Sequence, residues 1–434
     1  MKMMNIEFHS QEMRGDYPRV WNQPKIQCHF SETEQLMIER SHHRMVERSK
    51  TEKLSPRERA WGTIYGHDPI DYIPMEVPYS PNAANRVLDS FIESPSIITN
   101  KDLYDYPNLN FLSLALFFAR IPSDSLFLLV QSYGEEQLTS KFRLVDHGPP
   151  LAVEGIAQTA DAVEAKANLE FFMDNLPDPA NRGLFPLNLW ITKQSIKTFP
   201  EFLVRGCCCA GSIASASFLR GPKEFLLDVR KRPELANLAI TCGTKYLLRK
   251  LDRMIEAIGE PFDIDNKNGN ALWWCDGGGG YLTLEEFKRT YDLHFGISVP
   301  YCAKKGFPPF VATVAGGPAT QVVAKTIEEQ IGGGGIMVGT GVPPIDEGFE
   351  IMERRDKTLD RLYMDGAVGV KLFLAGEEPT RKWFKDFASY CAKTPEKGLR
   401  WEIFTSSLDP HLPLPNLDML CRVHRETMNY PVTG

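Results

Sequence analysis

From residue 55 onward, short apolar runs alternate with longer stretches in which apolar residues recur every three or four positions. Short runs of this kind are typical of buried β-strands, and the longer pattern is typical of helices. The strand candidates are 71–78, 187–192, 202–209, 271–275, 310–314, 336–338, 370–374 and 401–404. The helical patterns between them cover 221–258, 283–302, 320–330, 345–364 and 380–392. Strand–helix alternation predicts a parallel sheet, and seven or eight units over about 360 residues favour an α/β fold of the (β/α)₈ TIM-barrel type.

Local signals refine this prediction. Ser55 is suited to be an N-cap, Pro56 to be the first residue of a helix, and Gly66 to follow its end. A doubly wound sheet, the rival fold, would carry a G-x-G-x-x-G turn after its first strand, and the chain has none there. The glycine run 277–280 follows a strand and precedes a helix expected to start at Thr283, so we expect it in a loop at the catalytic face of the barrel. The run 332–335 precedes a strand, which predicts the opposite face.

Residues 1–54 have a different character from the rest. They are polar and carry no strand signal, and 31–53 is a helix candidate with Glu and Arg at helical spacing. We therefore divide the chain into an N-terminal polar, helical arm (1–54) and a barrel domain (55–434). The arm is expected to lie on the surface or to contact a partner, with His42 and His43 as solvated residues.

Composition narrows the classes of function. The chain has 434 residues, 43% hydrophobic and 24% charged, with a net charge of −7. This balance gives no reason to expect nucleic acid or an acidic membrane as partner, and no apolar run reaches the length of a membrane span. The nine cysteines include no C-x-x-C pair. We expect free thiols in a reducing, cytoplasmic setting, with 207–209 as small core residues.

Four segments, in this order, resemble the uroporphyrinogen decarboxylase (URO-D) superfamily, which includes the decarboxylase and the corrinoid- and coenzyme M-linked methyltransferases. They are SPRERAWGTIYGHDPIDYIPME (55–76), CCAGSIASASFLRGPKEFLLDVRKRPELA (208–236), WWCDGGGGYLTLEEFKRTYDLHF (273–295) and WEIFTSSLDPHLPLPNLDMLCRVHRE (401–426). The second is the most distinctive. The resemblance implies a (β/α)₈ barrel, in agreement with the pattern above, and a homodimer.

The chain departs from the family at the known sites. The zinc-dependent members have His-x-Cys on one strand and a further Cys in the last strand-to-helix turn, where this chain has Thr313, Ala315 and Leu408. Because zinc activates a thiol as a thiolate, losing these ligands argues against zinc and against coenzyme M as methyl acceptor. The Arg-rich decarboxylase signature is also missing, since only Arg86 follows the first strand. A substrate with many carboxylates requires several cations.

The candidate catalytic residues lie where strands end. Asp276 ends a strand at the start of the glycine-rich loop, and Asp409 and His411 lie in the last strand-to-helix loop. At the mouth of a barrel these groups are suited to hold or transfer a proton. A capping role for Asp276 remains an alternative.

The candidate substrate-binding residues surround the same edge; they are Glu76, Tyr79, Trp273, Trp274, Gly277, Tyr281 and Thr313. One of the two tryptophans is expected to point into the barrel and the other outward, because side chains alternate along a strand. An inward Trp gives a flat apolar wall for a planar ligand, or packs in the core. His294 and Asp71 are expected to be structural, and Arg205 and Arg220 to lie at the surface or in ion pairs.

The favoured interpretation is a methyltransferase component that moves a methyl group between a small-molecule substrate and a partner corrinoid (cobalamin) protein. The chain has no D-x-H-x-x-G sequence, so a corrinoid would sit on the partner. Two alternatives stay open: a decarboxylase acting on a tetrapyrrole or other carboxylated aromatic, and a non-catalytic binding protein on the same barrel.

Overall fold

A computed structural model gives the fold. It describes residues 26, 28–65, 71–77, 79, 87, 100–128, 135–143, 151–181, 183–208, 210–263, 265–276, 282–307, 310–313, 336–340, 362–368, 374–393, 401–405 and 414–428. Within these residues, no helix combines the length and the apolar character needed to cross a membrane.

The centre of the molecule is an eight-stranded parallel sheet in the order β1-β10-β9-β8-β7-β6-β5-β2. Its strands are β1 (Met75–Glu76), β2 (Ser125–Phe127), β5 (Leu203–Cys208), β6 (Ala271–Asp276), β7 (Phe310–Thr313), β8 (Ile336–Thr340), β9 (Leu362–Val368) and β10 (Trp401–Thr405). Neighbours in the run from β5 to β10 are consecutive in the chain, as strand–helix repetition requires. The prediction of a parallel sheet is therefore confirmed.

The first and last strands of this order are also joined. The backbone amide of Asp124 donates to the carbonyl of Met75 at 3.0 Å, and the amide of Tyr79 donates to the carbonyl of Phe127 at 2.8 Å. These bonds run between the segments that contain β1 and β2. Strands β1 and β2 thus lie side by side, although they are the first and last strands of the order given above.

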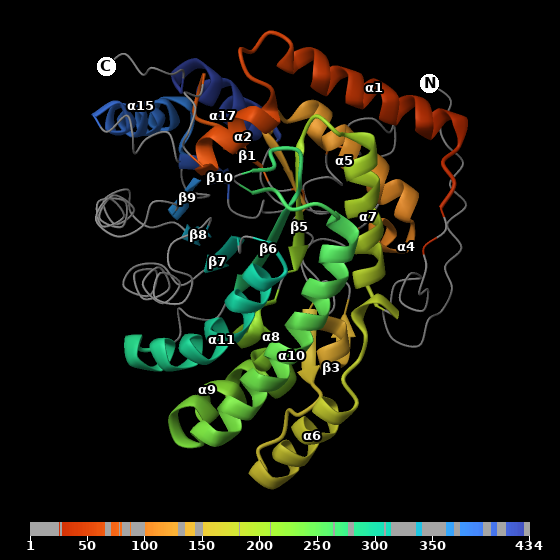
Figure 1. The fold of residues 1–434 in the computed structure, drawn as a ribbon, viewed down its shortest axis with the longest axis vertical. Helices are drawn as coiled ribbons and strands as arrows, with labels where there is room; N and C mark the ends of the chain where they lie inside the picture. The colour runs from red at the N-terminus through yellow and green to blue at the C-terminus, as the bar shows by residue number, and fades with distance from the viewer. Residues whose placement is uncertain are drawn as a thin grey trace.

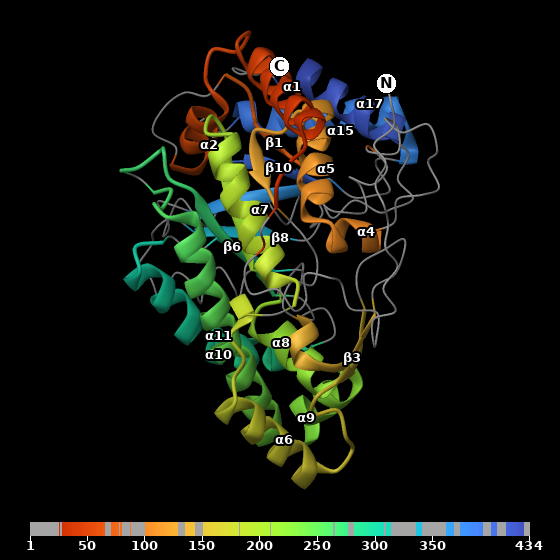
Figure 2. The same cartoon turned by 90° about the vertical axis from the view of Figure 1, so that its right-hand side faces the viewer.

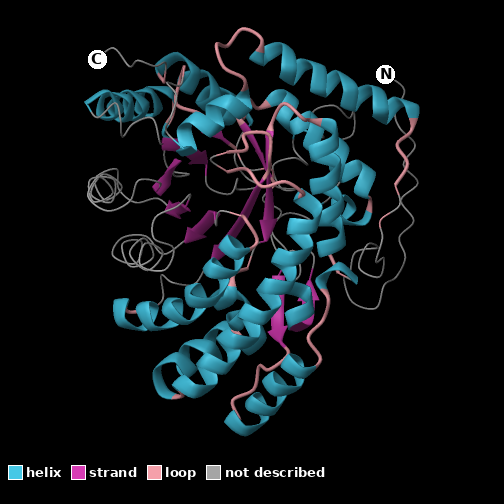
Figure 3. Ribbon diagram, in the orientation of Figure 1, coloured by secondary structure: helices cyan, strands magenta, loops and turns pink. Residues whose placement is uncertain are grey.

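Helices surround the sheet, as the colouring by secondary structure shows (Figure 3). They are α1 (Glu32–Ser49), α2 (Pro56–Tyr65), α4 (Asn100–Asp105), α5 (Pro107–Arg120), α6 (Ala162–Asp174), α7 (Phe185–Thr198), α8 (Ser212–Arg220), α9 (Pro222–Lys231), α10 (Pro233–Ile258), α11 (Leu284–Lys304), α15 (Glu377–Lys393) and α17 (Leu414–Thr427). Short 3₁₀ turns are η2 (Glu135–Leu138) and η3 (Pro179–Asn181), and a separate hairpin pairs β3 (Thr139–Arg143) with β4 (Leu151–Gly155).

Helices also mark the two ends of the molecule. Helices α1 and α17 lie at one end, and α6 and α9 at the other (Figure 1). The view turned by 90° shows the same separation (Figure 2). Because β5 leads into α8 and α9, the carboxyl ends of the strands face the α6–α9 end.

Capping residues fix two helix starts as predicted. Ser55 and Glu58 exchange hydrogen bonds at the start of α2, with Pro56 as its first residue. Thr283 and Glu286 form a capping box at the start of α11. Each reciprocal pair satisfies amide groups that the first helical turn leaves without partners.

One strand prediction is wrong. Residues 187–192 belong to α7, which begins at Phe185 with proline in its first turn. An apolar run that is buried on several sides does not distinguish a strand from a helix. Residues 370–373 of another expected strand lie outside the described residues, and so do residues 345–361 of the helix expected at 345–364. Residues 362–364 of that expected helix belong instead to β9. Pairing with β8 and β10 overrides the weak strand propensity of Asp365 and Gly366. The helix expected at 320–330 lies outside the described residues.

The N-terminal helix packs on the rest of the chain. The buried face of α1 includes Ile38 and Met45 and lies against α5. Arg48 donates to the carbonyls of Phe118 and Ala119 at the end of α5. The expected surface arm is therefore a docked helix over these residues.

Candidate functional site

Side chains of β2, β5 and β6 alternate between the two faces of the sheet. Leu126, Val204 and Trp274 belong to the hydrophobic core that packs against the helices. Their neighbours in sequence point to the opposite face. The register places Phe127 beside Arg205 and Cys207 beside Trp273, so polar and aromatic side chains meet on this second face.

A buried ion pair lies on this face. Arg205 Nη1 donates to Glu76 Oε1, and Ser125 Oγ donates to Glu76 Oε2. The side chains of Glu76 and Arg205 are both fully buried. The Arg205 guanidinium also lies 5.7 Å from the ring centroid of Phe127. Burying two charges is unfavourable unless they are paired and hydrogen-bonded. Removing one of Glu76, Ser125 or Arg205 would therefore leave a buried polar group of the others without its partner.

Trp273 extends the cluster to β6. Its ring meets Phe127 edge-on, with centroids 4.5 Å apart. The indole is 2% exposed, and its Nε1–H has no hydrogen-bond acceptor among the described residues. Buried Trp N–H groups usually have a partner. The two tryptophans therefore lie on opposite faces of β6, with Trp274 on the helix side and Trp273 on the other. Its role in substrate binding stays a prediction.

The predicted acid lies beside a predicted substrate contact. Asp276 and Thr313 are register partners at the carboxyl ends of β6 and β7. Their backbones are described and their side chains are not. The other predicted site residues, Gly277, Tyr281, Asp409 and His411, lie outside the described residues.

Tyr79 has a different environment from the one predicted. Its hydroxyl donates to Asn110 Oδ1 at 2.6 Å, and its ring contacts Phe117 and Phe118 of α5. The side chain is fully buried, and burial raises the pKa of its phenol well above the usual range. The apolar helix α5 thus holds Tyr79 on the helix side of β1, away from the Glu76–Arg205 pair. The sequence signal that led to the prediction was only its position after a strand.

The described residues give no metal-binding group. No cluster of three or more His, Cys, Asp or Glu side chains suited to a metal occurs among them. Burial raises the pKa of Cys242 and of Cys421 to about 12, so these thiols stay protonated at neutral pH. Cys207 and Cys208 are also buried, and they are consecutive residues of β5, so their side chains point to opposite faces of the sheet. The predicted zinc-ligand positions Ala315 and Leu408 lie outside the described residues.

A second buried network lies at the opposite ends of the strands. Arg59 of α2 contacts three carboxylates, Asp71 at 2.6 Å, Asp124 at 2.6 Å and Glu52 at 2.8 Å. Tyr72 donates to Asp124 at 2.7 Å and lies under the Arg59 guanidinium. Burial alone would raise the pKa of Asp124, yet Arg59 and Arg425 hold it below its ordinary value. Asp71 therefore has a structural role, as predicted. The sequence analysis did not predict how many residues this network joins.

His424 of α17 borders this network. It is fully buried between the rings of Tyr72 and Phe384. Burial lowers the pKa of His424 from 6.5 to about 4. The imidazole is therefore neutral in the folded protein throughout the neutral range.

This histidine predicts an acid-sensitive step. Between pH 6.5 and 4 the unfolded chain binds a proton at His424 that the folded chain excludes, so stability falls as pH falls through this window, by up to about 3 kcal/mol. The loss from carboxylates with lowered pKa, such as Asp124, comes at lower pH. We expect His424→Phe to flatten the slope of unfolding free energy against pH in this window, as measured by urea titration. The exposed control His43→Phe should keep the wild-type slope, and an unchanged slope in His424→Phe would contradict the assignment.

Comparison with known proteins gives a fold likeness. No known protein-family profile matches the chain, and no characterised protein matches it by sequence search. Among solved structures, the chain is similar to a methyltransferase from Methanosarcina mazei at 15% identity and a TM-score of 0.62. The match covers 86% of this chain and 99% of the other. At this identity, the chain shares the fold of that methyltransferase.

Proposed function

We propose that this chain is a methyltransferase component that moves a methyl group between a small molecule and a corrinoid carried by a partner protein. The observation that carries the proposal is the fold likeness to a methyltransferase over 86% of this chain and 99% of the other. The sequence resemblance to the URO-D superfamily, which also contains methyltransferases, points the same way.

The proposal includes a closed (β/α)₈ barrel. The two backbone hydrogen bonds between the β1 and β2 segments support closure, since these strands end the eight-stranded order. In a closed barrel Glu76, Arg205 and Trp273 would line the interior, and Asp276 and Thr313 would lie at its carboxyl-terminal mouth. Active sites of such barrels lie at that mouth.

Each side chain then has a task. The buried Glu76–Arg205 pair would hold a polar substrate group at a fixed position, and the ring of Trp273 would form an apolar wall whose N–H meets a substrate acceptor atom. The partner's corrinoid supplies a strong nucleophile in its reduced form and a methyl donor in its methylated form. When the methyl group leaves an oxygen or nitrogen, that atom keeps the bonding electron pair and requires a proton, which Asp276 would provide.

The test is a titration with free corrinoid followed by visible absorption. The protein is mixed with reduced cobalamin and a panel of methylated alcohols, amines and aromatic ethers, and the loss of the Co(I) band is recorded. We expect one class of donor to consume the band at a rate that depends on the protein, and Asp276→Asn to slow it about 100-fold or more. No response with any donor, together with turnover of a porphyrinogen, would replace the proposal with the decarboxylase alternative.

A further inference from the structure

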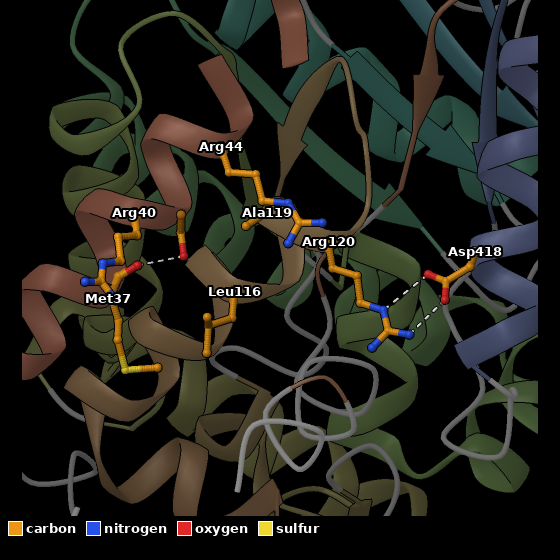
Figure 4. Close-up of a pocket in the computed structure, with 8 residues that line it drawn as sticks. Met37, Arg40, Arg44, Leu116, Ala119, Arg120 and Asp418 are labelled. Carbon is orange, nitrogen blue, oxygen red and sulfur yellow. Dashed lines mark hydrogen bonds and ion pairs between the residues drawn. The ribbon is translucent and has the colours of Figure 1, made fainter. Parts of the chain in front are cut away.

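A groove at the α1–α17 end of the molecule carries an unusual charge pattern. It lies between α1, α5 and α17 and has a volume of about 590 Å³. That volume is within the range of small-molecule sites. Its apolar part is formed by Met37, Leu116 and Ala119, and its polar residues are Ser41, three arginines and one aspartate (Figure 4).

Two of the arginines lie one turn apart on α1. Arg40 and Arg44 are both exposed, and within the described part of the chain neither makes a hydrogen bond or an ion pair. Glu47, the carboxylate three residues beyond Arg44, is engaged by Lys50. Like charges four residues apart destabilise a helix slightly. This arrangement therefore brings no stability to α1 by itself.

The third arginine is fixed by the aspartate. Arg120 donates to Asp418 Oδ1 at 3.2 Å and to Oδ2 at 2.8 Å, which joins the end of α5 to α17. Arg48, one turn beyond Arg44, donates to backbone carbonyls at the end of α5 and sets the distance between α1 and α5. The walls of the groove are thus held in place, while Arg40 and Arg44 keep their donors available.

The charges select the ligand. One aspartate compensates one of the three arginines, so the groove keeps two uncompensated positive charges in a chain whose net charge is −7. Guanidinium groups match the oxygen geometry of phosphate, and a phosphomonoester carries nearly two negative charges at neutral pH. The apolar part suits a ring or aliphatic body attached to that phosphate.

We propose that this groove is a binding site for a small phosphomonoester with an apolar or ring-shaped body. Arg44, whose guanidinium points toward the Arg120 side of the groove, binds the phosphate, and Arg40 adds a second positive charge at the other side, beside Met37 (Figure 4). Met37, Leu116 and Ala119 contact the body. Such a ligand would bridge α1 to α5 and α17, so binding should raise the temperature of unfolding of the whole chain. This site is independent of the proposed methyl transfer.

The test measures binding of phenyl phosphate to the full chain by calorimetry and by thermal unfolding. Benzoate, with the same ring and one negative charge, and inorganic phosphate, with no ring, are the comparison ligands. We expect phenyl phosphate to bind at least about 10-fold more tightly than either, and the Arg40→Ala/Arg44→Ala variant to lose at least about 10-fold in affinity together with the thermal shift. The matched control is Lys193→Ala/Lys197→Ala, which removes two exposed charges at the same spacing on α7.

Three results would overturn the proposal. The first is no saturation by phenyl phosphate below about 10 mM. The second is equal affinity for phenyl phosphate and benzoate, which removes the argument from charge. The third is an equal loss of affinity in the lysine control, which would show that net charge rather than the groove governs binding. Both double variants alter exposed residues, so we expect them to fold.

Discussion

Arg59→Leu is expected to destabilise the protein by about 3–5 kcal/mol, among the largest effects of any single substitution in the described residues. The change leaves the buried carboxylates of Asp71 and Asp124 without their main cation, and Glu52 with Arg425 alone. An uncompensated buried charge is far less favourable than an intact pair. Urea unfolding followed by circular dichroism measures the loss.

Two further variants serve as comparisons for Arg59→Leu. Arg59→Lys keeps the charge but cannot reach three carboxylates with one planar fork, so its loss should be intermediate. Arg422→Leu removes an arginine that pairs with Glu377 and Glu426 on the surface, where we expect a change of about 1 kcal/mol or less. The loss of unfolding free energy in Arg59→Leu should also become smaller at acidic pH. Protonation neutralises the carboxylates that the substitution leaves unpaired in an apolar environment. A deficit equal to that of Arg422→Leu would show that the network is not a determinant of stability.

The strands that sequence patterning located share a physical property. Residues 202–209, 271–275 and 401–404 are short apolar runs in a sheet covered by helices, and they correspond to β5, β6 and β10. Strand β2 has three residues and lies after the strongly apolar helix α5, so no periodicity marks it. In α7 the apolar residues lie on several sides of the helix, which hides the helical period.

The candidate site shows the same limit. Glu76 and Trp273 are predictable from their positions in strands, because strand residues at one face of a parallel sheet converge. The partners of Glu76 are not predictable in this way. Arg205 lies 129 residues beyond Glu76, and Ser125 lies in β2, which no sequence pattern marks. Convergence of this kind depends on the register between strands, and a single sequence carries no information about register. The same holds for Arg59, whose partner Asp124 is 65 residues away.

The Glu76–Arg205 pair gives the second large prediction. Arg205→Met and Glu76→Gln should each destabilise the protein by about 3–5 kcal/mol, because each leaves one fully buried group without its partner. The double variant Glu76→Gln/Arg205→Met removes both charges at once. We expect it to be more stable than either single variant, with a coupling free energy of about 1–3 kcal/mol in a double-mutant cycle measured by urea unfolding.

The double variant also separates stability from function. If the pair serves only to hold β1, β2 and β5 together, a folded double variant should retain methyl transfer, since its sheet is intact. If the pair holds the substrate, as proposed, the double variant should fold and still lose about 100-fold or more in kcat/KM, because the positioning group is gone. Trp274→Phe, which alters the adjacent residue on the helix side of β6, is the matched control for activity and should keep it. Full activity in a folded Glu76→Gln/Arg205→Met protein would place the substrate elsewhere, toward the carboxyl ends of β6 and β7 where Asp276 and Thr313 lie together.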